Sequence, residues 1–245
     1  MMARKRIFSG IIMALLLNSM INSCKKDDNG NPYNGRTTAI FNPALTYGTM
    51  TDQDGNEYKT ITIGTQTWMA ENLRTTKYRD GTEIPNVTDN LDWANLTTGA
   101  YSTYKNTKRA DSIATYGRMY NWYAATYSLN IAPTGWHVPT DAEWATLTAY
   151  LGGESVAGGK LKEIETTHWL SPNDGATNQT GFTALPAGER SSGLFYSLGE
   201  YGYWWSATEY NTYRAWYHRV YTNFSNMYRD YCPKKVGFSV RCIKD

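Results

Sequence analysis

The stretch that decides the fold covers residues 135–153 and reads GWHVPTDAEWATLTAYLGG. Thr140 can accept a hydrogen bond from the backbone of Glu143 while the Glu143 carboxylate reaches back, which makes a capping box at a helix start. One face of the following turns carries four large apolar or aromatic side chains, those of Trp144, Leu147, Tyr150 and Leu151. Two glycines then end the run. The spacing predicts a capped helix over 140–151 whose aromatic stripe packs into a core.

Strand signals lie on both sides of this helix. Residues 59–64 alternate as a strand, and Asp54, Gly55 and Asn56 just before them are a hairpin turn signal. Asp52, Asp54 and Asn56 superficially suggest a calcium loop, but Gly55 stands too early for one and no glutamate closes it, so a turn is favoured. The other predicted elements are a short strand running into a short helix over 117–125, a short helix over 159–165, and strands over 182–185, 202–206, 214–221 and 237–243.

Six sequence blocks carry a family resemblance. They cover 63–73, 117–122, 135–144, 181–182 with 185–190, 204–209 and 237–242. Together they resemble the Fibrobacter succinogenes major paralogous domain, and the similarity extends over nearly all of 52–245. The resemblance implies an α+β domain with a C-type-lectin-like fold, short helices, small and mostly antiparallel sheets, and termini that lie close together. It also implies buried tryptophans, and we expect the core to contain Trp122, Trp136, Trp144 and Trp205.

The same resemblance links the chain to the formylglycine-generating enzymes. Those enzymes hold copper with a close pair of cysteines near the C-terminus, whereas Cys232 and Cys242 here stand ten positions apart. The sequence contains no hydrolase elbow, P-loop or zinc spacing. Nothing in it brings the carboxylates of Glu143 and Glu189 together as an acid–base pair. We therefore expect a protein that is not an enzyme, with no catalytic residue, no metal and no cofactor.

The three histidines of the chain do not suggest a site either. His137, His168 and His218 stand far apart in the sequence. His137, between Trp136 and Val138, is interpreted as a packed structural residue with a hydrogen-bonded ring.

The first two dozen residues are typical of an export signal. Positive charges at residues 4–6 precede an apolar stretch over 7–17 that is too short to span a membrane. Residues 21–24 read INSC and resemble a bacterial lipobox, whose cysteine is acylated. We therefore expect a signal peptide over 1–23 and lipidation at Cys24, the alternative being an ordinary secretory signal that is cut elsewhere. The charged run 25–28 is similar to export tags of Bacteroidetes lipoproteins and favours an outer membrane lipoprotein that faces the cell exterior.

Composition and charge define the remaining expectations. Residues 24–46 are rich in turn formers and lack an amphipathic period, which indicates a flexible tether before a domain over 47–245. Removing the three positive charges of residues 4–6 from the formal charge of +2 leaves −1, so nucleic acid is not expected as a partner. In an oxidising compartment Cys232 and Cys242 could form a disulfide or stay unpaired, and the sequence favours neither.

The tract over 210–231 is the most informative segment for function. The chain has 20 Tyr and 9 Trp against 6 Phe, and this tract combines Tyr with Asn, Arg, Ser, Thr and Asp. Rigid aromatic anchors among adaptable polar groups are typical of a binding surface. We expect Trp216 to point inward beneath one contiguous exposed surface. The candidate ligand-binding residues are Tyr213, Arg214, Tyr217, Arg219, Tyr221, Asn223, Asn226, Tyr228, Arg229 and Tyr231.

These features predict a surface-anchored lipoprotein that recognises a protein or glycan through the tract, with the membrane as a second partner through the lipid anchor. The tract also resembles the variable segments of retroelement-diversified proteins, so diversification stays open. One alternative is a structural cell-envelope lipoprotein without a specific ligand, whose tract is a solvated rim. The least favoured is an enzyme related to the formylglycine generators. The lectin signatures Glu-Pro-Asn and Gln-Pro-Asp are absent, which disfavours calcium-bridged sugar binding.

Overall fold

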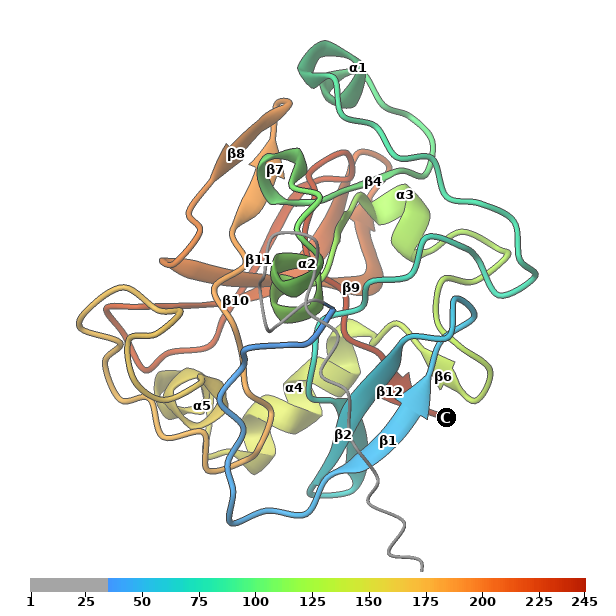
Figure 1. The fold of residues 1–245 in the computed structure, drawn as a ribbon. Helices are drawn as coiled ribbons and strands as arrows, with labels where there is room; N and C mark the ends of the chain where they lie inside the picture. The colour runs from blue at the N-terminus through green and yellow to red at the C-terminus, as the bar shows by residue number, and fades with distance from the viewer. Residues whose placement is uncertain (1–34) are drawn as a thin grey trace, which may run out of the picture.

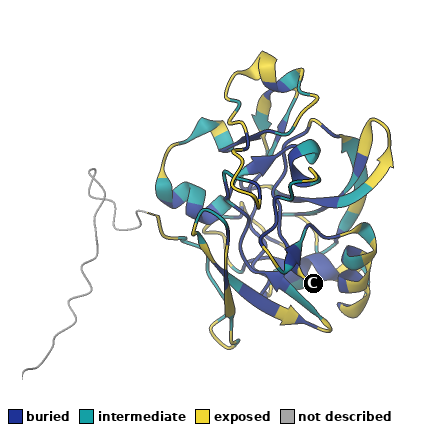
Figure 2. Ribbon diagram, turned by 90° about the vertical axis from the view of Figure 1, so that its right-hand side faces the viewer, coloured by how far each residue is buried: buried dark blue, intermediate teal, exposed yellow. Residues whose placement is uncertain are grey.

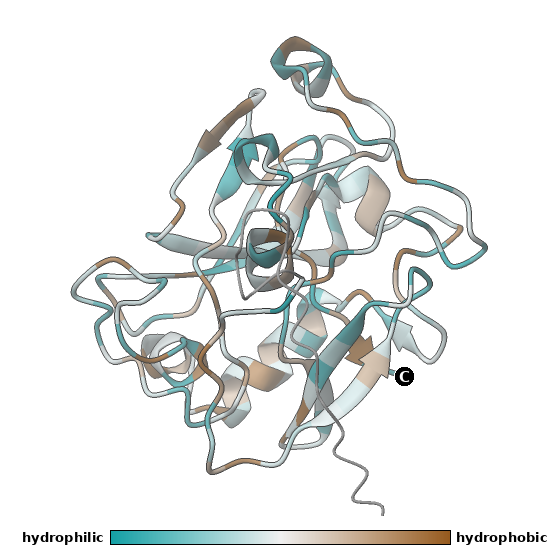
Figure 3. Cartoon of the chain, in the orientation of Figure 1, coloured by the Kyte–Doolittle hydropathy of each residue, from teal (hydrophilic) through white to brown (hydrophobic). Residues whose placement is uncertain are grey.

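The computed structural model describes residues 35–245, so the predicted signal peptide and Cys24 lie outside the described residues. Short helices and long loops surround a five-stranded and a three-stranded antiparallel sheet (Figure 1), which confirms the α+β class. Buried residues concentrate in the middle of the molecule and exposed ones in the outer loops (Figure 2). Much of the ribbon is pale in hydropathy (Figure 3). Tyr and Trp, whose rings carry polar tips, fill a large part of the core.

The five-stranded sheet joins the two ends of the domain. Its strand order is β1-β2-β3-β12-β6, and all neighbours are antiparallel. The C-terminal strand is thus held in the same sheet as the N-terminal hairpin, as the family resemblance implied (Figure 1). The bounds are β1 Gly48–Thr51, β2 Glu57–Ile63, β3 Gln66–Met69, β6 Trp136–His137 and β12 Ile243–Lys244.

The hairpin between β1 and β2 turns where the sequence predicted it. The Asp52 carboxylate accepts hydrogen bonds from the backbone N–H groups of Asp54 and Asn56, both at 2.9 Å, and from the Tyr58 hydroxyl at 2.6 Å. These bonds satisfy polar groups that a tight turn leaves without partners in the strand ladder. The interpretation of this segment as a turn is confirmed.

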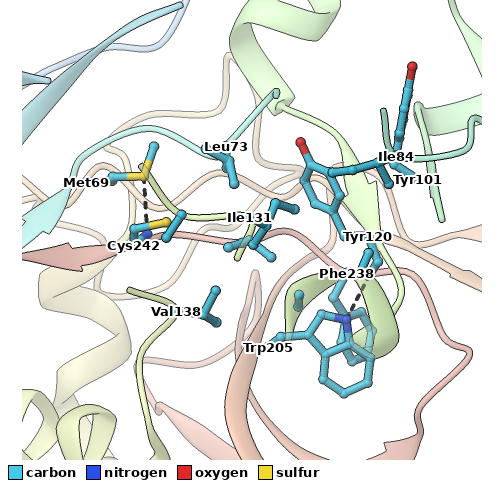
Figure 4. Packing of buried hydrophobic residues seen from close by; sticks show 14 of the residues in the cluster. Met69, Leu73, Ile84, Tyr101, Tyr120, Ile131, Val138, Trp205, Phe238 and Cys242 are labelled. Carbon is cyan, nitrogen blue, oxygen red and sulfur yellow. Dashed lines mark hydrogen bonds between the residues drawn. The ribbon is translucent and has the colours of Figure 1, made fainter. Parts of the chain in front are cut away.

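The three-stranded sheet, in the order β11-β10-β9, separates two hydrophobic clusters. Because successive side chains of a strand point to opposite faces, the neighbours Trp204 and Trp205 enter different clusters. Trp205 packs on Phe238 with ring centroids 4.7 Å apart and donates its indole N–H to the Tyr120 carbonyl at 2.8 Å (Figure 4). The bounds are β9 Tyr201–Asn211, β10 Arg214–Tyr221 and β11 Tyr228–Pro233, so the strands predicted over 202–206 and 214–221 are confirmed.

Helix α4 (Asp141–Tyr150) begins with the predicted capping box. Thr140 Oγ1 accepts from the Glu143 N–H at 3.3 Å, and the Glu143 carboxylate accepts from the Thr140 N–H at 2.7 Å. Trp144 and Leu147 are fully buried. The apolar stripe is narrower than predicted, because Tyr150 lies over Gly64 at the surface and is 66% exposed.

The remaining elements are short. The strand and helix predicted over 117–125 are confirmed as β5 and α3. Two small antiparallel pairs, β4 with β5 and β7 with β8, complete the strands. The helices are α1 Asn90–Ala94, α2 Ala110–Tyr116, α3 Trp122–Ala125 and α5 Glu154–Leu161, with a 3-10 turn over Tyr104–Asn106, and the strands are β4 Tyr101–Ser102, β5 Met119–Tyr120, β7 Glu189–Ser191 and β8 Leu194–Tyr196.

Three predicted elements differ from the structure. The helix expected over 159–165 starts earlier, as α5, and ends before Lys162, whose ammonium turns inward to three backbone carbonyls. Residues 182–185 form only one isolated bridge, because the Arg241 guanidinium donates to the carbonyls of Phe182 and Thr183. Residues 237–243 pair through single bridges, and only the end of the segment belongs to a strand.

Residues 35–46, expected as the end of a flexible tether, lie against the domain instead. The Ile40 N–H donates to the buried Glu163 carboxylate at 2.5 Å, and Thr38 Oγ1 lies 2.9 Å from His168 Nε2. The side chains of Phe41 and Leu45 pack on the second hydrophobic cluster, which is the one that contains Trp204. Residues 35–46 therefore form a strap along the domain. The apolar residues between the turn formers pack on the domain surface, which holds the segment in place.

The predicted core tryptophans and the cysteines have mixed outcomes. Trp136, Trp144 and Trp205 are buried as expected. Trp122 is only partly buried, and the Lys234 ammonium covers its ring at 4.4 Å. Cys232 and Cys242 are free thiols. Cys242 lies in the core beside Met69 (Figure 4), whereas Cys232 lies on β11, so the alternative left open by the sequence is decided in favour of unpaired cysteines.

Candidate ligand-binding surface

The tract over 210–231 runs from the end of β9 through β10 and the loop 222–227 into β11. Trp216 pairs with Tyr231 across the strands, and Arg219 pairs with Tyr228. Directly paired side chains share a face of the sheet, and the face alternates with each residue. The tract is therefore divided between the two faces, and the prediction of one contiguous surface is wrong.

One face ends in an aromatic platform, which we define as Tyr210, Trp216 and Tyr231. The rings of Tyr210 and Tyr231 stack with centroids 3.8 Å apart, and each meets Trp216 edge-on, at 4.9 Å and 5.5 Å. Tyr213, in the turn between β9 and β10, is 79% exposed. Interlocked rings offer a flat, rigid contact area that loses little conformational entropy on binding.

Arg229 connects the platform to helix α4. Its guanidinium lies 3.3 Å from the Trp216 ring centroid, and its Nη2 lies 2.7 Å from Oδ2 of Asp141. The other oxygen of Asp141 lies 3.2 Å from Nε2 of the buried His218. Burial alone would raise the pKa of Asp141, but the hydrogen bonds from His218 and Arg229 lower it to about 2. Burial lowers the pKa of His218, so Arg229 is the cation that balances this carboxylate.

Arg214 gives the platform a positive edge. Its guanidinium lies 5.5 Å from the Tyr231 ring centroid, and within residues 35–245 it has no ion pair. The nearby charges of Lys234 and Glu209 pair at 3.1 Å. Since Asp141 balances Arg229, the charge of Arg214 remains available to a ligand.

The opposite face carries a tyrosine ladder, which we define as Tyr201, Tyr221 and Tyr228. Tyr221 packs on Tyr201 at 5.1 Å and on Tyr228 at 5.0 Å, and its hydroxyl donates to the Tyr228 hydroxyl at 2.9 Å. Arg219 lies beside the ladder, with Nη2 3.9 Å from a carboxylate oxygen of Asp230. The three rings are half-buried, so the ladder presents ring edges and hydroxyls rather than a flat aromatic face.

Two residues of the tract lie on the side opposite to the predicted one. Tyr217 is only 6% exposed and packs on Phe238 at 4.8 Å, where burial raises its pKa. Trp216 belongs to the partly exposed platform. We expected the larger ring to point inward, but the register of β10 directs Ala215 and Tyr217 into the core and Trp216 away from it. Tyr217 is therefore a packing residue.

The loop 222–227 lies at the far end of β10 from the platform. Its backbone is tied to α5, because the Gly159 N–H donates to the Ser225 carbonyl at 2.9 Å and the Met227 N–H donates to the Glu154 carbonyl at 2.8 Å. Within this loop Asn223 is exposed. The other predicted asparagine, Asn226, is half-buried and does not share a surface with the platform.

The predicted structural role of His137 agrees with its contacts. Its Nδ1 lies 2.6 Å from Asp245 and its Nε2 lies 2.8 Å from Glu143. Glu143 is thus engaged at the start of α4, while Glu189 lies on β7, where burial raises its pKa. In the described part of the chain, no three His, Cys, Asp or Glu side chains gather as a metal site would require. None of the helices over 35–245 has the length and apolar character to cross a membrane.

A comparison with protein families gives one match. The model of the Fibrobacter succinogenes major domain covers residues 61–244, which is more than half of the chain. The chain belongs to this family. The Fibrobacter succinogenes major domain thus includes both faces of the three-stranded sheet, the aromatic platform and helix α4. No curated protein and no solved structure matches the chain.

Three contributors to the platform were missing from the predicted site residues: Trp216, which was expected to point inward, Tyr210 and Asp141. Tyr210 falls inside the tract, and its stacking partner was predicted, but the pairing depends on how β9 and β11 flank β10. Asp141 is 88 residues away from Arg229 and looked like an ordinary helix-start residue. A carboxylate in the first turn of a helix is explained by the helix dipole alone, so no local signal could have indicated its second role.

Proposed function

We propose that this chain is a surface-anchored lipoprotein whose Fibrobacter succinogenes major domain binds a protein or glycan ligand through the aromatic platform and its neighbours Tyr213 and Arg214. The observation that carries the proposal is the partly exposed stack of Tyr210, Trp216 and Tyr231. Three large rings gathered at the surface, beyond what the core needs, mark an interaction site.

The platform combines a rigid side with side chains that can adapt to a ligand. Arg229 is held by Asp141 and covers one side of Trp216, so this side is rigid before any ligand arrives. Arg214 and Tyr213 are exposed and can adapt. A rigid anchor beside adaptable polar groups supports binding because little freedom is lost at the anchor.

Two further parts of the proposal rest on the sequence. The C-type-lectin-like fold is supported by the six family blocks and by the pairing of the C-terminal strand with the N-terminal hairpin. The lipid anchor at Cys24 is supported by the apolar segment and the lipobox before it. An anchor there would hold the domain at the outer membrane, facing the exterior. The proposal includes the possibility left open by the sequence, that a retroelement diversifies the tract over 210–231.

The test is binding of the full-length protein to an array of defined glycans and extracellular proteins. The double variant Tyr213→Ala with Arg214→Ala removes exposed side chains that carry little folding energy, and we expect it to weaken binding by about tenfold at an unchanged melting temperature. Tyr196→Ala, a change at a 44% exposed tyrosine of β8, is the matched control. Equal binding by the double variant and the wild type would move recognition away from the platform. Absence of binding by the wild type would favour a structural envelope protein.

A further inference from the structure

A hollow outside the tract has the features of a separate site. It lies between the loops around residues 78–85 and 97–99 and the segment 123–128, which includes most of helix α3. Its volume is about 500 Å³, within the range of sites that bind small molecules. It shares no residue with the platform or the ladder.

The hydroxyl of Tyr78 is the most informative group in this hollow. Tyr78 is only 4% exposed as a residue and borders the hollow, and its Oη makes no hydrogen bond within residues 35–245. Its ring packs against Tyr127 with centroids 4.9 Å apart. Burial and the neighbouring Tyr127 raise the pKa of Tyr78 to about 12, so the hydroxyl stays protonated and can donate. The hydroxyl is not one of the fully buried side-chain atoms that lack a partner in the described chain, so it keeps access to the hollow and can donate to a ligand there.

Gly99 keeps the space in front of this hydroxyl open. A Cβ atom at position 99 would lie 2.3 Å from Tyr78 Oη and 3.1 Å from Ala124 Cα. The first distance is too short for any real contact and the second is tight, so a side chain at this position would displace Tyr78 and fill the space in front of its hydroxyl.

The lining selects the class of ligand. Glu83 is the one charged side chain among the described residues that line the hollow, and no lysine, arginine or histidine joins it. Thr82, Thr98, Thr126 and other hydroxyl side chains provide hydrogen-bonding groups. The ring of Tyr127 is 49% exposed and offers an apolar face. An anionic ligand would meet only repulsion from Glu83, whereas a sugar ring could stack on the tyrosine and donate its hydroxyls to the carboxylate.

We propose that this hollow binds a neutral saccharide, with Tyr127 against the sugar ring, the Tyr78 hydroxyl donating to a sugar oxygen and Glu83 accepting from sugar hydroxyls. A second hollow of about 450 Å³ shares Glu83 and Pro85 with the first and also contains Thr76 and Asn86. An oligosaccharide therefore fits the site better than a single sugar. The proposal does not depend on ligand binding at the platform.

The test is isothermal titration of the full-length protein with cellohexaose, xylohexaose, mannohexaose and chitohexaose, and with acidic hexagalacturonate for comparison. We expect millimolar or tighter binding of at least one neutral hexasaccharide and none of the acidic one. Tyr127→Ala should weaken that binding about tenfold, since it removes the stacking face. Tyr78→Phe should weaken it about threefold to tenfold at an unchanged melting temperature, because the hydroxyl has no partner in the protein itself.

Two controls make the outcomes distinct. Tyr196→Ala changes a tyrosine of similar exposure outside the hollow and should leave binding unchanged. The platform variant Tyr213→Ala with Arg214→Ala should also leave it unchanged, so failure here and failure of the proposed function can be told apart. The proposal is overturned if no neutral hexasaccharide binds at millimolar concentration, if the acidic one binds instead, or if Tyr127→Ala and Tyr78→Phe bind like the wild type.

Discussion

Tyr213, Trp216 and Tyr217 have similar chemistry and very different positions. Tyr213 is almost fully exposed in a turn, Trp216 is half-buried in the platform, and Tyr217 is packed in the core. The difference does not come from hydrophobicity, since the most apolar of the three is not the most buried. It comes from the alternation of β10, which directs Tyr217 into one hydrophobic cluster and Trp216 to the opposite face, where the other cluster does not include it.

This contrast predicts the stability of two tyrosine variants. Tyr217→Ala should lower the free energy of unfolding by about 3 kcal/mol, because it removes a large ring from a packed cluster. Tyr213→Ala should change it by no more than about 0.5 kcal/mol. Urea denaturation of both variants measures the difference. Similar values for the two would show that β10 does not direct Tyr217 into the core.

The ion pairs of His137 predict a pH dependence. Burial alone would lower the pKa of His137, but its hydrogen bonds to Asp245 and Glu143 raise it above 6.5. A raised pKa means that the stabilisation is fully present below the unfolded value of 6.5 and is lost as the pH rises through the folded value.

We therefore expect His137→Gln to lower the melting temperature more at about pH 6 than at about pH 9. Calorimetric scans of the wild type and the variant at both pH values measure the two differences. Equal differences would mean that the charge of His137 contributes nothing.

At the scale of elements, close contact between α5 and the loop 222–227 holds one end of the three-stranded sheet. A Cβ atom at Gly158 would lie 2.1 Å from the Asn226 carbonyl oxygen, so the helix can approach the loop only without a side chain there. The Lys162 ammonium adds bonds to the carbonyls of Tyr221 and Phe224, both at 3.1 Å. These contacts place a glycine in a helix in spite of its low helix propensity.

Gly158→Ala is therefore expected to destabilise the domain by about 1 to 3 kcal/mol, although alanine favours helices by about 1 kcal/mol. Ser155→Ala, at an exposed position of the same helix, should be neutral or slightly stabilising. Thermal unfolding followed by circular dichroism compares the two variants. A stabilised Gly158→Ala would show that the loop can move away at no cost.

At the scale of the whole molecule, the strap over 35–46 belongs to the folded domain. It covers the buried Glu163, contacts His168 and adds Phe41 and Leu45 to the second cluster. A chain that begins at residue 47 leaves Glu163 without its Ile40 partner, at a cost of about 1 to 3 kcal/mol. Its melting temperature should be several degrees below that of a chain beginning at residue 35. Equal melting temperatures would mean that the strap rests on the surface without stabilising it.

The lipid anchor is tested on the full-length protein in a bacterium that processes lipoproteins. Cys24→Ala should abolish lipidation and release the protein from membranes, because the apolar segment before it is too short to span a bilayer. Detergent partitioning and the mass of the mature N-terminus measure both effects. A variant that is still processed at the same position and stays in the membrane fraction would contradict the anchor.

The sequence by itself determined the parts of this protein that depend on neighbours in the chain. The capping box of α4, the turn after β1 and the strands β9 and β10 are local, because each follows from residues within a few positions of one another. The six blocks were also enough to indicate the family.

Only the tertiary structure decided which side chains meet. Which of Trp216 and Tyr217 faces the core depends on which cluster covers each side of β10, and the pairing of Arg229 with Asp141 depends on how α4 packs beside the sheet. The strap over Glu163 and the hollow around Tyr78 likewise unite segments that are distant in sequence. The physical reason is that residue types and short spacings specify turns and periodicity, whereas packing between distant segments selects the face, the partner and the exposure of each side chain.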